Sequence, residues 1–248
     1  MIEFSARESE LFGVRFGRAT ITSDFKDWER LRRLSADMQL DYLRLKVVNP
    51  EDSFLDHFCQ ADWHADLMGV IRLYKIVARE AHAHYDAPVA RFQKVTETDK
   101  QLLKDLLIKT YTEVPFGFFQ YKALLGKFPL EKQLENIGSY IADNFCGQYQ
   151  DKEAYIGYVN GKPIECFASD FSDGTTAVTL YAGILTEHRD NDLFKDMIRF
   201  FKQLCWQKGM AKSICGARLE NLSSQYAMER EGSVSYGTEW VYMISFDK

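Results

Sequence analysis

The sequence predicts a mixed α/β fold of the α+β type, and three observations support this expectation. Of the 248 residues, 46% are apolar and 14% are aromatic, a content typical of a folded protein with a substantial core. Strand-like and helix-like periodicities alternate along the chain. In the second half, the dipeptides Asn160-Gly161 and Asp173-Gly174 separate three consecutive strand-like stretches, as the tight turns of a meander do.

The first half of the chain alternates between strands and helices. The expected elements are strands at 13–21, 42–48 and 67–77 and helices at 25–39 and 54–60. The helix at 25–39 is the best defined, because apolar residues from Trp28 to Met38 recur at spacings of three and four. The polar stretch 79–88 ends in a proline. We therefore expect a smaller N-terminal α/β domain at 1–86 and a second domain at 87–248.

The second half is more regular. The expected elements are strands at 89–95, 154–159, 163–171, 176–185, 212–217 and 239–246 and helices at 96–111, 130–145, 191–208 and 222–230. The long helix at 191–208 ends in Lys208 and is followed by Gly209, a typical C-terminal signal. An aromatic loop at 115–129 separates the first two of these helices.

Charge and cysteine content exclude several classes of protein. Lys and Arg number 31 against 36 Asp and Glu, a net charge of −5, so we expect neither a nucleic-acid nor a membrane-surface partner. The charged start is unlike a secretory signal, and no apolar window approaches the ~20 residues of a membrane helix. The 5 cysteines lack ligand spacing, and His82 and His84 lack a third ligand nearby. These features predict a cytoplasmic protein without a disulfide or a metal site.

The order of elements over residues 88–248 resembles the GNAT superfamily of acetyl-CoA-dependent N-acetyltransferases. The closing stretch adds detail: Asn221, a short helix, Gly232 and a last strand are similar to the pattern of that superfamily, with the same spacing of eleven residues. Within the superfamily, the two-part layout resembles the dTDP-fucosamine acetyltransferases. The shared features are the segment at 8–18 (ESELFGVRFGR) and the strand end at 180–183 (LYAG).

This resemblance implies where acetyl-CoA would bind. The strand end would offer backbone groups to the pantetheine amides, and the following turn would hold the pyrophosphate at a helix N-terminus, where N–H groups are unpaired. The strand-end residues are Gly183, Ile184 and Leu185, and the turn residues are Arg189, Asp190, Asn191, Asp192, Leu193 and Phe194. Asn221 belongs to the same implied set, and an amine would attack the thioester directly.

The chain departs from the superfamily at two places. Asp192 and Phe194 stand where the superfamily has small residues, so a carboxylate and a ring would obstruct the phosphate; alternatively, the acidic residues only cap the helix. The tyrosine that would protonate the departing thiolate falls on Met228. Tyr226 could replace it only if the helix is shifted, and packing on Leu222 is the alternative role.

Two further groups are candidates for the acceptor side. Glu165 and Tyr181 lie on adjacent expected strands and could relay the amine proton, provided that both point into the same cleft. The rings of the aromatic loop could stack on a sugar or a base, or could pack on one another. These rings are Phe116, Phe118, Phe119 and Tyr121.

We therefore expect an N-acetyltransferase with acetyl-CoA as co-substrate and no metal, a transferase of the acyltransferase class. By the resemblance, its small-molecule acceptor is the amino group of a nucleotide-linked amino sugar of surface polysaccharide biosynthesis. The alternative is a GNAT-shaped protein that is not catalytic or that uses another acyl donor. The sequence leaves open whether the protein forms a homodimer.

Overall fold

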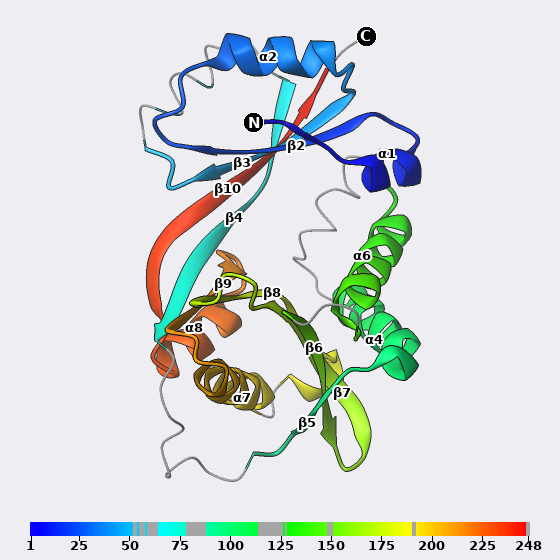
Figure 1. Ribbon diagram of the computed structural model, residues 1–248, viewed down its shortest axis with the longest axis vertical. Coiled ribbons are helices and arrows are strands. Elements are labelled where there is room, and N and C mark those ends of the chain that lie inside the picture. Colours follow the sequence, from blue (N-terminus) through cyan, green and yellow to red (C-terminus); the bar gives the residue numbers. More distant parts are fainter. Residues whose placement is uncertain are drawn as a thin grey trace.

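The protein is described here from a computed structural model, which covers residues 1–51, 54, 58, 64–77, 88–113, 126, 128–147, 151–189 and 192–246. Its strands form a ten-stranded sheet in the order β1-β2-β3-β10-β4-β9-β8-β7-β6-β5. Figure 1 shows an upper part covered by α2 and a lower part between α7 and α8 on one side and α4 and α6 on the other. The predicted mixed α/β class is confirmed.

The elements have the following bounds. The first part contains β1 (Glu3–Phe4), α1 (Ala6–Phe12), β2 (Phe16–Thr22), α2 (Trp28–Asp37), β3 (Tyr42–Val48) and β4 (His64–Val77). The second part contains β5 (Arg91–Lys94), η1 (Glu97–Asp99), α4 (Lys100–Thr112), α6 (Leu130–Phe145), β6 (Lys152–Val159), β7 (Lys162–Asp170), β8 (Thr176–Ile184), η2 (Thr186–His188), α7 (Leu193–Gln207), β9 (Lys212–Arg218), α8 (Leu222–Arg230) and β10 (Val234–Ser245).

Most expected elements are present, and two differences have physical causes. The sequence analysis missed β1 and α1, because both elements are short and the buried position of α1 at Glu8 depends on ion pairs with Arg18 and Arg44, which are distant in sequence. Strand β10 begins at Val234 rather than at 239, since an irregularity between Ser235 and Gly237 hides its alternation. The expected helix at 54–60 is described only at 54 and 58. The stretch 79–87, with His82 and His84, lies outside the described residues.

Strands β2 and β3 run parallel, and the two faces of this pair differ in chemistry. Leu43, Leu45 and Val47 point toward α2 and form one core with Leu31 of that helix. The alternate residues of both strands point to the opposite face, where Arg18 lies directly beside Arg44 in the register. This face therefore carries two neighbouring arginines beside the apolar cluster that contains Phe16 and Phe128.

Strand β4 joins the two parts of the chain. It pairs with β10 along most of its length, and residues Ile71 to Val77 pair with β9 on the other side. A strand from the N-terminal part thus lies between two strands of the C-terminal part, and Figure 1 shows β4 and β10 running together through the molecule. The division at 86 and 87 stays a prediction.

No helix in the described ranges is both long and apolar enough to cross a membrane.

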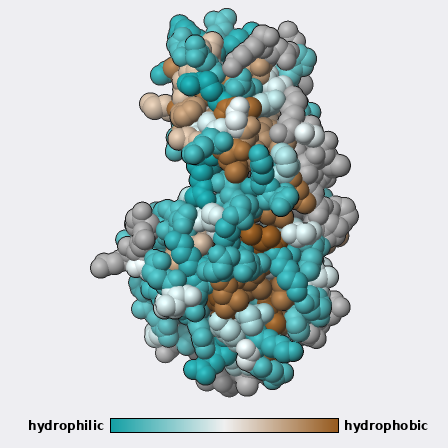
Figure 2. Space-filling model, turned by 90° about the vertical axis from the view of Figure 1, so that its right-hand side faces the viewer, coloured by the Kyte–Doolittle hydropathy of each residue, from teal (hydrophilic) through white to brown (hydrophobic). Residues whose placement is uncertain are grey.

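On the face that carries α1, α4 and α6, hydrophobic side chains reach the surface in several separate patches between hydrophilic ones (Figure 2). The four cysteines in the described part of the chain, Cys146, Cys166, Cys205 and Cys215, are not joined in disulfides.

Candidate functional site

Strands β8 and β9 start as a parallel pair and then separate. Their pairing covers three positions and ends at Val178 with Ile214, although both strands continue. Directly beyond this point β8 has a bulge at Leu180, because Ser169 of β7 pairs with Thr179 while Ala168 pairs with Tyr181. A bulge bends its strand away from the neighbour. The two strands therefore diverge beyond Val178 and Ile214, and we call this feature the β8–β9 split.

The split leaves backbone groups of β8 without a strand partner. Leu185 N–H donates to Ile164 O on β7 at 2.9 Å, so by the alternation of an antiparallel ladder the groups of Ile184 and Ala182 point away from β7. Two side chains reach their carbonyls: Tyr111 Oη donates to Ala182 O at 3.3 Å, and Arg189 Nε donates to Ile184 O at 3.1 Å. The N–H groups on that side have no strand partner within the described residues.

Of the three strand-end residues expected to bind pantetheine, only Ile184 has its backbone groups directed at the split. The backbone of Gly183 faces β7 by the same alternation, and so does Leu185 N–H, whereas Leu185 O accepts from His188 N–H at 2.9 Å. Glycine at 183 serves packing, since a Cβ there would lie 2.2 Å from Thr110 Cγ2 of α4. Ala182, which the sequence analysis did not include, takes the place of Gly183.

The turn into α7 keeps the conformation of a glycine without having one. Asp192 has φ +57° and ψ 10°, the left-handed region, and its side chain pairs with Lys195 Nζ at 3.2 Å. It makes no side-chain capping bond, so the expected cap is made by its backbone carbonyl alone. Arg189 also donates from Nη2 to Thr110 O at 3.3 Å, which ties the strand end to α4. Asp190 and Asn191 lie outside the described residues.

The two apolar residues that begin α7 differ in position. Leu193 is 1% exposed and belongs to the core between α7 and strands β6 to β8. Phe194 is half-buried and packs against that core and also against a second cluster that contains Ala217 of β9 and Met228 of α8. Its ring therefore bridges the two sides of the split near the helix N-terminus.

Helix α8 turns Met228 inward and Tyr226 outward. Met228 is 4% exposed and packs with Tyr74 and Ile198, whereas Tyr226 is 67% exposed. The predicted packing of Tyr226 on Leu222 is not supported by burial, since Leu222 is itself exposed. Asn221 caps this helix, because its side-chain oxygen accepts from Ser224 N–H at 3.2 Å.

Glu165 and Tyr181 lie on opposite faces of the sheet, which corrects the expectation that they share a cleft. Glu165 is fully buried on the α7 side, and neither carboxylate oxygen has a hydrogen-bond partner in the described part of the chain. Burial raises its pKa to about 8, and the neighbouring Asp196 adds to the rise. Tyr181 belongs instead to the core under α4 and α6.

The sequence analysis missed a charged cluster whose arginines partly offset the rise that burial causes in the pKa of Tyr181. The cluster consists of Glu8, Arg18 and Arg44, from α1, β2 and β3. These residues are far apart in sequence, and only the parallel register of β2 and β3 would have brought the two arginines together. Of the other acceptor candidates, Phe116, Phe118, Phe119 and Tyr121 lie outside the described residues.

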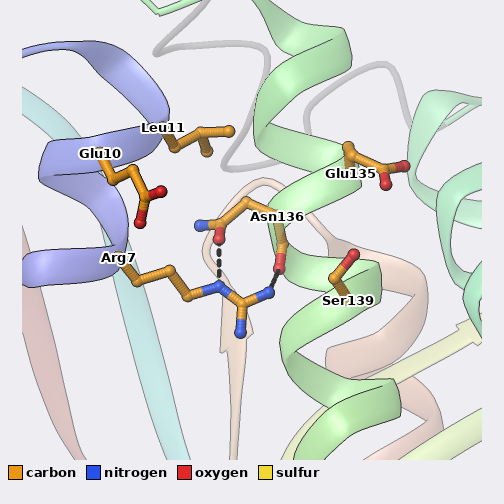
Figure 3. Close-up of a pocket in the computed structure, with 6 residues that line it drawn as sticks. All are labelled: Arg7, Glu10, Leu11, Glu135, Asn136 and Ser139. Atoms are coloured by element: carbon orange, nitrogen blue, oxygen red, sulfur yellow. Dashed lines mark hydrogen bonds between the residues drawn. The ribbon is translucent and has the colours of Figure 1, made fainter.

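An open pocket of about 260 Å³ lies between α1 and α6 (Figure 3). Its arginine is already bound: Arg7 donates to Asn136 Oδ1 at 2.6 Å and to Asn136 O at 2.9 Å. The hydrogen bonds of Arg7 thus connect α1 to α6 at this pocket. Among the described residues, no group of three metal-ligating side chains is present.

Comparisons with known proteins identify the fold. No family model matches the chain, and no curated protein matches it. Among solved structures, a conserved protein of unknown function from Staphylococcus epidermidis is 16% identical with a TM-score of 0.63, over 98% of this chain and 90% of that one. A GCN5-related N-acetyltransferase from Kribbella flavida is 12% identical with a TM-score of 0.59, over 94% and 82%.

N-myristoyltransferase from Saccharomyces cerevisiae, solved with bound myristoyl-CoA, is 10% identical with a TM-score of 0.54. The match covers 95% of this chain and 60% of that enzyme. Together these likenesses show that the chain has the GNAT acyltransferase fold.

Proposed function

We propose that this protein is an acyl-CoA-dependent N-acyltransferase that uses acetyl-CoA. The β8–β9 split is the observation that carries the proposal. Ala182 and Ile184 turn N–H and C=O groups into it, and a pantetheine arm, which has two amides, would pair with such groups as a strand does. The likeness to an N-acetyltransferase and to an enzyme that holds myristoyl-CoA supports the same donor class.

In the proposed reaction, a neutral amine attacks the thioester carbonyl, so a C–N bond forms and the C–S bond breaks. The electron pair of that bond leaves on sulfur, and the ammonium proton passes to water. A backbone N–H of the split would stabilise the oxyanion that develops. Because Met228 is buried and has no proton to give, the thiolate would take its proton from solvent. The lack of a general acid at position 228 would cost roughly a hundredfold to ten-thousandfold in rate.

A second candidate function is favoured by the turn before α7. The carboxylate of Asp192 and the ring of Phe194 stand where phosphate and pantetheine would approach, and Tyr111 and Arg189 hold the carbonyls of the split. Weak donor binding would follow. A GNAT-shaped protein that binds another ligand, or another acyl donor, is therefore the alternative.

For the acceptor, we propose the amino group of a nucleotide-linked amino sugar, as in surface polysaccharide biosynthesis. The expected acetyl site at Ala182 is one residue from Tyr181, whose partly buried ring is a flat surface of the kind on which a sugar or base packs. The amine is the necessary feature, because only a nucleophilic nitrogen forms the product amide.

Titration calorimetry with acetyl-CoA tests the donor. We expect binding at submillimolar concentration, and no heat at millimolar acetyl-CoA would remove the proposal. Release of free thiol then tests the acceptor. A nucleotide-linked amino sugar should produce thiol, while the matched nucleotide sugar with a hydroxyl in place of the amine should not. Equal release with both would mean hydrolysis, and would contradict an N-acyltransferase.

A further inference from the structure

The end of β8 beyond its bulge is fastened to the last turn of α4, and the fastening includes both carbonyls that face the split. Tyr111 Oη donates to Ala182 O at 3.3 Å, and Arg189 Nε donates to Ile184 O at 3.1 Å. The same guanidinium donates from Nη2 to Thr110 O at 3.3 Å. Where β9 no longer pairs with β8, side chains of α4 and of the following turn therefore hold the strand.

Close packing accompanies these hydrogen bonds. A Cβ at position 183 would lie 2.2 Å from Thr110 Cγ2, so the backbone at Gly183 approaches α4 more closely than a larger residue would permit. Thr110 is 1% exposed and lies in the last turn of α4, where helix carbonyls lack a partner within the helix. Its carbonyl is thus a suitable acceptor for the guanidinium of Arg189.

The direction of the Arg189 side chain differs from what the resemblance implied. Arg189 was expected in the turn that holds the pyrophosphate, but its Nε and Nη2 groups donate to carbonyls that precede that turn in the sequence. A planar guanidinium with two acceptors on different elements has a fixed orientation and fixes both acceptors in turn. A carbonyl oxygen has two lone pairs, so Ile184 O can accept from Arg189 and also from an amide of a ligand.

We propose that Arg189 and Tyr111 are positioning residues that hold the end of β8 against α4, so that the split presents its backbone groups to the pantetheine arm of the donor. The inference rests on the proposed function and deepens it, because it assigns Arg189 to the pantetheine half of the donor rather than to the phosphates. A strand end held in its binding conformation loses less conformational entropy when the ligand binds. A cap of α4 is the alternative role of Arg189, and it predicts lower stability with unchanged affinity.

A second contact between the same two segments supplies a matched control. Lys109 Nζ of α4 lies 3.2 Å from Glu187 Oε1 of η2, and both side chains are more than half exposed. This ion pair joins α4 to the segment after β8, but it does not involve a carbonyl of the split. Lys109→Gln also removes one positive charge, as Arg189→Gln does, so it should leave donor affinity unaltered.

Calorimetry with acetyl-CoA and with S-acetylpantetheine, each added to the full chain, tests the inference. S-acetylpantetheine has the thioester and both amides but no phosphate. If Arg189 positions the split, Arg189→Gln should weaken both ligands by the same factor, roughly tenfold, the size of about one hydrogen bond. If Arg189 instead meets the pyrophosphate, the variant should weaken acetyl-CoA alone.

Two further variants separate positioning from charge and from folding. Arg189→Lys keeps the charge but loses the fork that reaches two carbonyls, so it should weaken both ligands as Arg189→Gln does; recovery of acetyl-CoA binding would indicate a phosphate contact. Tyr111→Phe keeps the ring, which packs edge to face at 6.2 Å from the ring of Tyr181, and removes only the hydroxyl. It should also weaken both ligands, and it tests the inference even if the Arg189 variants fail to fold in denaturant unfolding.

The remaining outcomes are distinct. Unchanged affinity in the folded variants would overturn the inference, and tighter binding would do the same, since the side chains would then compete with pantetheine for the carbonyls. A parent that binds acetyl-CoA but not millimolar S-acetylpantetheine would also overturn it. If the parent binds no acetyl-CoA, the proposed function itself fails.

Discussion

Asp192 gives the sharpest test of the donor site, because two substitutions separate its charge from its backbone conformation. Asp192→Asn removes the carboxylate and keeps a residue that tolerates the left-handed region. Asp192→Gly removes the carboxylate and also the cost of a positive φ, about 1 kcal/mol. If the pyrophosphate of acetyl-CoA approaches the N-terminus of α7, both variants should bind acetyl-CoA more tightly than the parent.

The expected size follows from the exposure of the side chain. A carboxylate about 4 Å from a phosphate oxygen is repelled by ~1 kcal/mol in bulk water and by ~4 kcal/mol at an effective dielectric near 20. The Asp192 side chain is 69% exposed, which favours the lower end of this range. A gain of about 1 to 2 kcal/mol corresponds to a roughly fivefold to thirtyfold lower Kd.

The two variants should also differ in stability. Both lose the exposed ion pair with Lys195 and the favourable position of a negative charge at a helix N-terminus, each worth about 0.3 to 1 kcal/mol. Asp192→Gly recovers the cost of the positive φ, so it should remain within about 1 kcal/mol of the parent, while Asp192→Asn should be the less stable of the two.

Titration calorimetry gives the affinities, and denaturant unfolding gives the stabilities. If neither variant binds acetyl-CoA more tightly, the phosphate does not approach this helix end, and the reasoning from the turn is refuted. If only Asp192→Gly does so, backbone shape rather than charge controls the site.

Three further outcomes are expected. Phe194→Ala should open the split near α7, so calorimetry should show about tenfold tighter binding of acetyl-CoA. The free energy of unfolding, measured with denaturant, should fall by about 2 to 4 kcal/mol because core packing is lost. Unchanged affinity would show that the ring does not obstruct the donor. Tyr226→Phe should leave the rate of thiol release unchanged, since the hydroxyl is exposed, and a hundredfold decrease would make Tyr226 the acid. Because the pKa of Glu165 is raised to about 8, the stability contributed by its protonated form is fully present below pH 4.5 and is lost as the pH rises toward about 8. Glu165→Gln should therefore unfold at a higher denaturant concentration than the parent at pH 8 but not at pH 4.5. If the stabilities of both proteins changed with pH in the same way, Glu165 would not be protonated in the folded protein.

The sequence predicted the fold where local signals and tertiary structure agree. The helix at Leu130–Phe145 and the helix at Leu222–Arg230 have the expected bounds, because apolar periodicity marks the first and the cap Asn221 marks the start of the second. The Asn160-Gly161 turn adopts positive φ at both residues, as such a hairpin requires. Strand β4 was expected as an element, but its place between β9 and β10 was not, since strand order depends on contacts far apart in sequence.

The candidate site was predictable in outline and not in detail. The free backbone groups at the end of β8 are what the resemblance to the GNAT superfamily implied, whereas the bulge at Leu180 that bends β8 leaves no mark in the alternation of that strand. The faces of Glu165 and Tyr181 were indeterminate because a one-residue shift of register exchanges the two sides of a strand. Asp192 adopts the left-handed conformation that glycine takes most easily, which its residue type did not reveal in the sequence.

The position of β4 also constrains how the chain reaches its folded state. Strand β4 is synthesised early, yet its two neighbours are β9 and β10, which are synthesised much later. In the final sheet β4 is hydrogen-bonded on both sides. Until β9 and β10 are made, neither edge of β4 has a partner, and unpaired strand edges favour aggregation. Contacts of such long sequence separation also slow folding. Production of the protein should therefore depend more on temperature and chaperone supply during synthesis than on the stability of the finished fold.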